Sequence, residues 1–304
     1  MTLAGVRVAV TGASGFCGSA VARAAAAAGA RVCCLGRRPG PVGRHVPWDA
    51  AHQTPDLAGA DLVIHLAAAV GDPAPGPAAE RAYRAVNVDG TARLVDAVGD
   101  RPLVWVSSAS VYRPGGAGPL GEDHPVDGQL TAYGRTKAAG ERLALAAGAV
   151  VLRPRAVYGP GDPHLLPRLL AARRGRWLPV PGPDVRLSLT AVENLAEACL
   201  AASTWPAGAY NIADERPYSR DAVLRGVLAA TGSPARLARL PVGVATAAAT
   251  VSTTVARLTR RPPVLTRYAV DQLARGVVLD IGRARARGYR PRRTFDDFLG
   301  HLGG

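Results

Sequence analysis

A tyrosine and the chain's single lysine lie four residues apart in the segment AYGRTKAAGE (132–141). Lys137 is the only lysine among 304 residues, and all other strongly basic side chains are arginine. On a helix, positions 133 and 137 lie one above the other on the same face. A free phenol titrates near about 10, and a neighbouring ammonium stabilises the phenolate. The spacing therefore predicts a tyrosine made acidic by its neighbour and able to exchange protons near neutral pH.

A serine ends a strand-like run shortly before this helix. The run PLVWVSS spans residues 102–108, and Ser108 at its end can donate a hydrogen bond to the same substrate oxygen as Tyr133. Lysine also has a slender stem and a compact head that reach ribose hydroxyls with a geometry unlike that of a guanidinium. We predict Ser108, Tyr133 and Lys137 as catalytic residues, with Tyr133 and Lys137 also contacting a cofactor. The alternative is a Tyr/Lys pair on a helix surface with no chemical role.

A glycine-rich turn follows the first strand-like run and opens the first helix. In TGASGFCG (11–18), Gly12 permits the turn, Gly15 lets backbone approach a pyrophosphate, and Gly18 lets helix and strand pack closely. The helix N-terminus adds N–H groups that favour an anion. This order of elements predicts a dinucleotide-binding loop. Its expected contacts also include Ser14, Phe16 and Cys17.

Two arginines follow the second strand-like run, where enzymes that prefer NAD usually place a carboxylate on the ribose 2′-hydroxyl. The sequence there is CCLGRRPG, with Arg37 and Arg38 and no acid. Two guanidiniums suit a 2′-phosphate, so NADP(H) is the preferred cofactor and NAD(H) stays open. Asp49, in PWDA, stands where an acid can meet the adenine amino group.

The elements that must position these residues alternate between strand and helix. Strands are expected at 6–12, 30–36, 61–68, 102–108 and 149–154, and helices after the glycine turn to about Gly29, at 78–99 and at 131–147. Continuous apolar strands separated by helices predict a doubly wound parallel sheet of the Rossmann type. We expect a dinucleotide-binding domain over residues 1–160, with a later return near 187–213, and a smaller, mainly helical substrate domain over 161–304.

Six motifs occur in the order and spacing of a known superfamily. They are TGASGFCG, DLVIHLAA (61–68), NVDGT (87–91), SSASVY (107–112), YGRTK (133–137) and RPRAVYGPGD (153–162). Through these motifs, residues 6 to about 215 resemble the extended short-chain dehydrogenase/reductase superfamily. Within this superfamily, they resemble the NAD-dependent epimerase/dehydratase group. The C-terminal stretch PVLTRYAVDQLARGVVLDIGRARARGYRP resembles the 3β-hydroxysteroid dehydrogenase-like branch.

The resemblance implies Ser108, Tyr133 and Lys137 as a catalytic triad and a homodimer as the usual assembly. It also implies cofactor contacts from Asn87, Leu66, Ala67, Ala68 and Pro154.

Three departures from the family pattern narrow the reaction. Sugar-nucleotide dehydratases carry an Asp-Glu pair after the catalytic hydroxyl, where this chain has Ala109 and Ser110. Elimination of water is therefore disfavoured. Sugar-nucleotide epimerases commonly hold the diphosphate with an Asn where this chain has Ala156, which weakens a nucleotide-sugar substrate. Arg186 stands where such enzymes often use an arginine for that diphosphate, so this exclusion is incomplete.

Composition excludes several other classes. The net charge of +14 suggests nucleic acid, but the arginines of RARARGYRPRR (283–293) scatter around a helix, so we expect no specific nucleic-acid partner. Cysteines and histidines show no metal spacing, and the first strand starts too early for a signal peptide, which favours the cytoplasm. The uncharged stretch 240–256 is too weakly apolar to span a bilayer but can line a pocket, a dimer face or a membrane surface.

Together these features predict an NADP(H)-dependent carbonyl reductase or alcohol dehydrogenase. Its substrate is expected to be a small or medium organic molecule, with apolar or polyketide-like compounds included. The first alternative is a nucleotide-sugar epimerase or 4-ketoreductase using the same triad. The second is a non-catalytic nucleotide-sensing protein, which has no need of Ser108, Tyr133 and Lys137 together.

Overall fold

A computed structural model describes residues 2–71, 76–115, 118–163, 165–259 and 265–302. A seven-stranded parallel sheet forms its centre, in the order β11-β6-β5-β4-β1-β2-β3. Its strands are β1 (Arg7–Thr11), β2 (Arg31–Gly36), β3 (Arg44–Pro47), β4 (Leu62–His65), β5 (Leu103–Val106), β6 (Val150–Pro154) and β11 (Gly208–Ile212). The order reverses between β1 and β4, and this is the dinucleotide-binding topology. The predicted doubly wound Rossmann sheet is confirmed.

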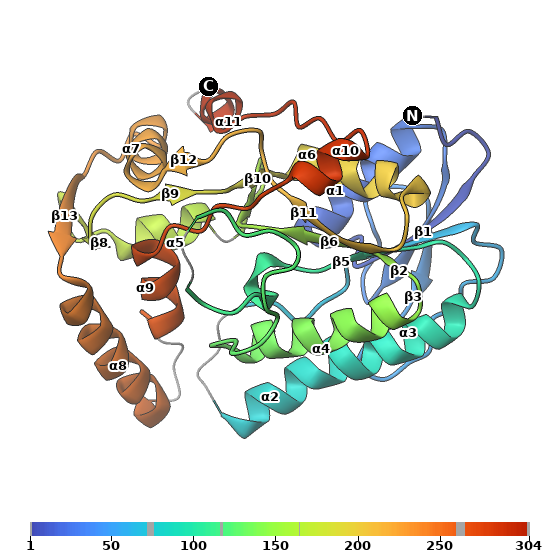
Figure 1. Cartoon of the computed structure of the whole chain (residues 1–304), viewed down its shortest axis with the longest axis horizontal. Helices are drawn as coiled ribbons and strands as arrows, with labels where there is room; N and C mark the ends of the chain where they lie inside the picture. Colours follow the sequence, from blue (N-terminus) through green and yellow to red (C-terminus); the bar gives the residue numbers. More distant parts are fainter. Residues whose placement is uncertain (1, 72–75, 116–117, 164, 260–264, 303–304) are drawn as a thin grey trace.

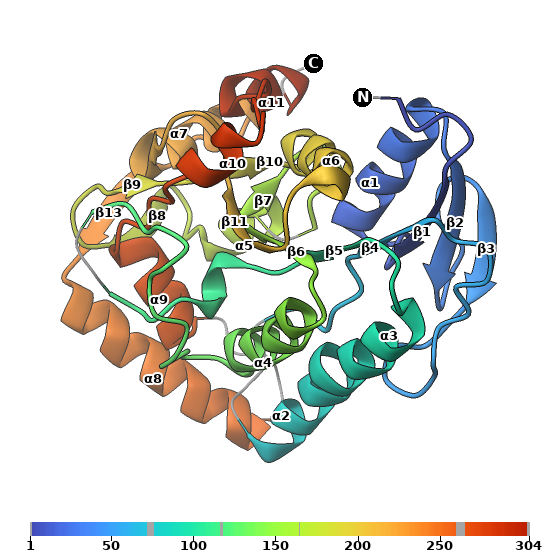
Figure 2. The ribbon, with the colours of Figure 1, turned by 45° about the vertical axis from the view of Figure 1, so that its right-hand side comes forward.

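Helices cover both faces of the sheet (Figures 1 and 2). On one face lie α1 (Phe16–Ala27) and α6 (Val192–Ala201), and on the other α2 (Pro77–Arg84), α3 (Gly90–Val98) and α4 (Ala132–Ala146). Successive side chains of a strand serve opposite faces, so Val8 and Val10 belong to one core and Ala9 to the other. This explains why β4, β5 and β6 are buried throughout and mostly apolar, with His65 in β4 and Arg153 in β6 as the polar exceptions.

The remaining elements gather mainly beside the sheet. They are β7 (Val157–Tyr158), α5 (Leu165–Ala172), β8 (Trp177–Pro181), β9 (Arg186–Leu187), β10 (Thr190–Ala191), β12 (Tyr218–Ser219), α7 (Arg220–Ala230), β13 (Arg236–Leu240), α8 (Val242–Thr259), α9 (Arg267–Ala274), α10 (Gly282–Ala286) and α11 (Phe295–Leu302). A separate core joins Tyr158, Leu178, Val223 and Phe295. Leu279 and Tyr289 instead pack into the core of the main sheet. The proposed division at residue 160 stays a prediction.

Two details differ from the expected elements. The segment expected as one helix over 78–99 contains a π-helical turn, Ala85–Asp89, between α2 and α3. A short 3-10 turn, Ala109–Val111, follows β5, and another, Ala202–Thr204, follows α6. In the described part of the chain, no helix is both long and apolar enough to cross a bilayer, and this includes α8.

Candidate active site

The glycine turn lies where the strand order reverses, at the carboxyl end of β1. Gly12 has a φ of 67°, and a side chain there would meet the Ala67 backbone nitrogen at 2.8 Å. A Cβ on Gly18 would collide with the Gly12 carbonyl oxygen. Gly15 caps α1 without a side-chain hydrogen bond, and the first turn of α1 carries no acid. The N–H groups that begin α1 are therefore suited to an anion approaching over bare backbone.

A threonine ties the ends of β1 and β4 together beside this turn. The Thr11 hydroxyl oxygen accepts hydrogen bonds from the N–H groups of Leu66 and Ala67, both at 3.1 Å. Its own hydrogen is then directed to His65 Nδ1 at 2.8 Å, so the ring proton of His65 lies on Nε2. These bonds fix the half-buried segment Leu66, Ala67 and Ala68 next to the glycine turn, as expected for a cofactor-binding wall.

Asn87 lies in the π-helical turn and connects the same wall to α4. Its side-chain oxygen accepts from the Ala69 N–H at 2.8 Å, and its nitrogen donates to the Ala69 carbonyl and to Thr136 Oγ1. The side chain is 1% exposed, so its polar atoms hold protein groups together. A π-turn often marks a functional site, and here it directs Asn87 between the β4 loop and α4.

The predicted catalytic residues come together at the carboxyl edge of the sheet. Ser108 follows β5 and caps the 3-10 turn, where its oxygen accepts from the N–H and the hydroxyl of Ser110 at 3.2 and 3.0 Å. Its own hydrogen is left for another oxygen. Tyr133 lies in the first turn of α4, near enough for a hydrogen bond between its phenol and Ser108.

Burial, and not the lysine, dominates the titration of Tyr133. Burial raises the pKa of Tyr133 well above its ordinary value, and the hydrogen bond with Ser108 only partly opposes this. Nearby Tyr268, Cys17 and Tyr83 raise the pKa further. This direction is opposite to the acidic phenol expected from the sequence, because a phenolate is poorly solvated at this position. At neutral pH Tyr133 therefore carries its proton.

Lys137 is 2% exposed and extends beneath the site. Its Nζ donates to the Val106 carbonyl at 2.7 Å and lies 3.6 Å from the centre of the Trp105 ring. Burial lowers the pKa of Lys137 to about 7, and Glu141 one turn further along α4 opposes this shift. One of the three ammonium donors is thus used by the protein, which leaves two for other oxygens.

A buried ion pair that sequence reasoning missed supports this arrangement. Arg153 of β6 pairs with Glu141 of α4 at 2.5 Å, and Glu141 also accepts from the Ser107 hydroxyl. Arg153 further donates to the Tyr112 hydroxyl. The network therefore joins β6 and α4 to Ser107, the residue that follows β5 and precedes Ser108. The i,i+4 spacing of Lys137 and Glu141 on α4 was the available sequence signal.

The residues predicted to select the cofactor occupy the expected edge. Arg37 and Arg38 follow β2 and are exposed. Asp49 is half-buried, and its carboxylate accepts from the Ala51 N–H at 2.9 Å. Pro154 ends β6 and is buried. These positions are compatible with the predicted contacts, which stay predictions.

Comparison with known proteins identifies the family. A model described as the NAD dependent epimerase/dehydratase family matches residues 8–213. The chain belongs to this family. The 2-alkyl-3-oxoalkanoate reductase of Shewanella oneidensis is 30% identical over 91% of this chain and 80% of its own length. The 4-hydroxy-2-methyl-3-oxo-4-farnesyl-3,4-dihydroquinoline-1-oxide ketoreductase of Stigmatella aurantiaca is 33% identical over 81% of this chain and 77% of its own.

A solved structure, MoeE5 in complex with UDP-glucuronic acid and NAD, has a TM-score of 0.74 and 26% identity, over 97% of each chain. The epimerase/dehydratase family and the reductases among its relatives confirm that this chain is an NAD(P)-dependent oxidoreductase. The predicted membership of the extended short-chain dehydrogenase/reductase superfamily is also confirmed.

The structure places Ala156 and Arg186, the two positions that bear on the nucleotide-sugar alternative. Ala156 has a φ of 44°, a left-handed conformation that asparagine adopts more readily than alanine. The backbone at this position thus has a geometry suited to Asn, while the side chain has no amide. Arg186 lies on β9, is exposed, and donates to the Pro217 carbonyl at 2.6 Å.

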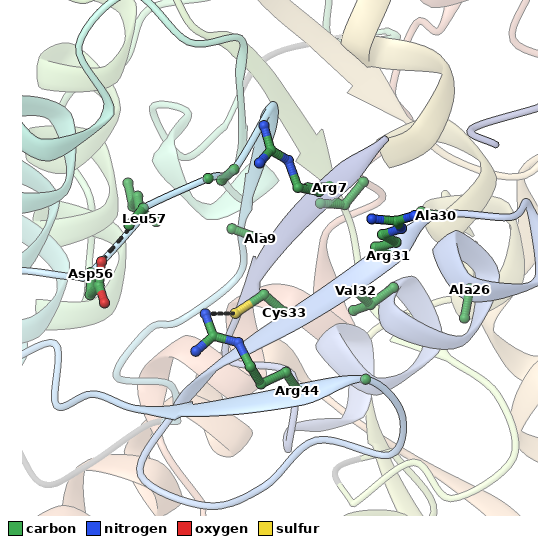
Figure 3. A pocket seen from close by; sticks show the side chains of 15 residues that line it. Arg7, Ala9, Ala26, Ala30, Arg31, Val32, Cys33, Arg44, Asp56 and Leu57 are labelled. Carbon is green, nitrogen blue, oxygen red and sulfur yellow. Dashed lines mark hydrogen bonds between the residues drawn. The ribbon is translucent and has the colours of Figure 1, made fainter. Parts of the chain in front are cut away.

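A surface hollow lies away from the predicted catalytic residues (Figure 3). It is lined by residues at the amino ends of strands, including Arg7, Arg31 and Arg44, and by Asp56 and Leu57 before β4. In a parallel sheet the amino edge is opposite the carboxyl edge where ligands bind. We therefore assign it no part in the reaction.

Proposed function

We propose that the protein is an NADP(H)-dependent carbonyl reductase, or alcohol dehydrogenase in the reverse direction. The observation that carries this proposal is the proton-bearing Tyr133, near Ser108 and one turn before Lys137 at the carboxyl edge of the sheet. A phenol that carries its proton at neutral pH has one to give to an oxygen that becomes negative during reduction. Burial alone makes that proton harder to release, and a positive charge on Lys137 lowers this cost.

The residues present fit a dinucleotide. A Cβ on Gly12 or Gly18 would fill the space against Ala67 and the Gly12 carbonyl, so the backbone is bare at the turn. The uncapped N-terminus of α1 would hold the pyrophosphate, Lys137 the ribose, and Arg37 and Arg38 a 2′-phosphate. Bound there, the nicotinamide supplies the hydride that reduces the carbonyl carbon.

The protein's own side chains carry out the proton transfer. Tyr133 gives its phenolic proton to the carbonyl oxygen as the carbon is reduced. Ser108 can donate to the same oxygen because Ser110 occupies only its acceptor side. Lys137, anchored on Val106, places a positive charge near the phenolate that forms. Solvent then restores the proton to Tyr133.

A ketone of small or medium size is the proposed substrate class, and this includes long-chain and polyketide-like molecules. The reductase names of the relatives from Shewanella oneidensis and Stigmatella aurantiaca support it. The MoeE5 structure contains UDP-glucuronic acid and NAD, so a nucleotide-sugar substrate remains the alternative. Ala156 in place of an amide argues against that alternative. A homodimer and a cytoplasmic location stay predictions.

The substitution Tyr133→Phe tests the proposal. It removes the proton donor while keeping the ring, so kcat should fall by about 10²-fold or more. Affinity for NADP⁺, measured by titration calorimetry, should stay nearly unchanged. Tyr289→Phe is the matched control, because this buried tyrosine donates only to the Ala213 carbonyl in the core. Unchanged turnover of Tyr133→Phe on a panel of ketones would defeat the assignment.

A further inference from the structure

One buried arginine lacks the carboxylate that the other buried arginines have. Within the described residues, Arg153, Arg155 and Arg220 are 3%, 7% and 1% exposed. Arg153 pairs with Glu141 and Arg220 with Asp221, both acids being buried as well. Arg155 has only neutral partners: its Nη1 donates to the Ser188 carbonyl at 3.0 Å, and its Nη2 makes two longer contacts, of 3.3 and 3.5 Å, with Gln272.

A buried guanidinium without an anion is energetically costly, and arginine cannot avoid the cost by losing its proton near neutral pH. Burial lowers the pKa of Arg155 only to about 10, so the side chain stays charged. Arginine has five N–H donors, and the contacts with Ser188 and Gln272 use up to three of them. The two contacts with Gln272 are long, so a carboxylate that replaced them would meet two N–H donors on one edge of the guanidinium, the fork geometry that carboxylates match.

Arg155 lies at the same edge of the sheet as the proposed catalytic residues. Strands β5 and β6 are parallel, with Val106 opposite Leu152. Continuing this register places Ser108 opposite Pro154, so Arg155 is the next residue beyond it. Neighbouring strands are about 4.8 Å apart, which keeps the two segments close. Arg155 therefore directly follows β6, and β6 lies next to β5, the strand that leads into Ser108.

Tyr268 of α9 links Arg155 to the proposed proton donor. It is close enough to both Tyr133 and Arg155 for its charge to raise the pKa of each. Gln272, one turn further along α9, is the residue that Arg155 contacts. The guanidinium and the phenol thus border the same part of the molecule, between α4, α9 and the end of β6.

We propose that Arg155 binds a carboxylate of the substrate and makes the enzyme selective for oxo acids over neutral ketones. This inference rests on the proposed carbonyl reduction by Tyr133. The carboxylate makes and breaks no covalent bond. In reduction, one hydride from NADPH and one proton from Tyr133 convert the ketone to a hydroxy acid, and NADPH becomes NADP⁺. In oxidation of the hydroxy acid, the same hydride and proton return.

The test uses oxidation, because 3-hydroxy acids are stable whereas 3-oxo acids lose CO₂. A 3-hydroxyalkanoic acid and its methyl ester are compared with NADP⁺ in the wild type, Arg155→Gln and Arg155→Lys. The wild type should favour the acid by about 10-fold or more in kcat/KM. Arg155→Gln should lower kcat/KM for the acid by about 10- to 100-fold, mainly through KM, and change the ester little. The kcat/KM of Arg155→Lys for the acid should lie between the values of the wild type and Arg155→Gln. Arg225→Gln, which removes an exposed charge on α7, should leave the preference intact.

A second measurement needs no variant. A saturated carboxylic acid of the same length should compete with the hydroxy acid in the wild type, and its methyl ester should not. A purely structural Arg155 predicts equal losses for acid and ester in Arg155→Gln, and that result, or a wild type indifferent to the carboxylate, overturns the inference. Turnover of the ester then still supports carbonyl chemistry. Failure to turn over acid, ester and neutral ketones alike overturns the proposed function as well.

Discussion

His65, Trp105 and Lys137 pack against one another near the proposed active site, and the charge of Lys137 affects the protonation of His65. His65 stacks on Trp105 with ring centres 6.1 Å apart, and Lys137 lies over the same indole. Burial, together with the smaller effect of the Lys137 charge, lowers the pKa of His65 to about 3. Because His65 is neutral, a positive charge in this group comes from Lys137, which its pKa of about 7 leaves partly charged at neutral pH. Such a charge stabilises a developing phenolate.

The neutral His65 predicts a specific acid sensitivity. Its pKa is depressed in the folded state, so the unfolded state binds a proton between about pH 6.5 and pH 3 and the folded state does not. Stability should therefore fall as pH falls through this window, by up to about 1.4 kcal/mol per pH unit from this group. His65→Asn should flatten the pH dependence of the free energy of unfolding, measured in urea from pH 7.5 to 4.5. The exposed His52→Asn should keep the wild-type slope, and equal slopes in all three proteins would refute the idea.

Sequence reasoning placed Ser108, Tyr133 and Lys137 together because a strand end and one helical turn fix their positions locally. It could not give the direction of the Tyr133 pKa, since this depends on burial in the folded chain and on the charges of distant residues such as Tyr268. Arg155 had a signal, a charge directly after a buried strand, but the missing carboxylate partner is visible only in three dimensions.

At the scale of elements, a glycine sets the distance between α4 and the π-helical turn that carries Asn87. A Cβ on Gly140 would collide with the Asn87 carbonyl oxygen and lie 3.2 Å from Trp105. Because backbone forms the contact, it cannot move aside as a flexible side chain would. The missing side chain at Gly140 thus lets α4 approach the π-helical turn, whose Asn87 holds the Ala69 segment after β4.

In the variant Gly140→Ala, two effects on stability oppose each other: alanine favours the helix, and its Cβ collides with the neighbouring backbone. Alanine favours a helix by about 1 kcal/mol over glycine, yet overpacking a core costs about 1–3 kcal/mol or more. The collision should prevail, with a net loss of stability in thermal unfolding and weaker NADP⁺ binding. Gly243→Ala in α8 is the control, because nothing lies within 4 Å of its added Cβ. That variant should be neutral or slightly stabilised, and a stabilised Gly140→Ala would contradict the packing argument.

Long apolar strands and amphipathic helices were predictable because their periodicity is local. Strand β3 was not, since RHVP buries only Val46 and ends in proline, so no pattern marks it. The π-turn was also invisible, because one extra residue within 78–99 leaves the apolar pattern almost unchanged. Its existence depends on Asn87 reaching Ala69 and Thr136, which are contacts between elements.

At the scale of the whole molecule, positive charge is present at both edges of the sheet, but only one edge has the features of a ligand site. Arg37 and Arg38 follow β2 at the carboxyl edge, and Arg31 and Arg44 begin strands at the amino edge. A net charge of +14 attracts phosphates generally. The proposed preference for NADP(H) can therefore arise in two ways: from direct contact with the 2′-phosphate, or from the electrostatic field of the whole protein.

Two double variants with the same loss of charge separate these explanations. Arg37→Ala/Arg38→Ala should weaken NADP⁺ binding by about 10- to 100-fold and leave NAD⁺ binding nearly unchanged, because charge-assisted contacts to one phosphate are lost. Arg31→Ala/Arg44→Ala removes the same charge from the amino edge and should change neither dissociation constant by more than about 2-fold at physiological salt, where screening acts over about 8 Å. Equal losses in the two variants would show that the whole field, and not the pair after β2, selects the cofactor. An unchanged NADP⁺ affinity in the first variant would remove Arg37 and Arg38 from the cofactor site.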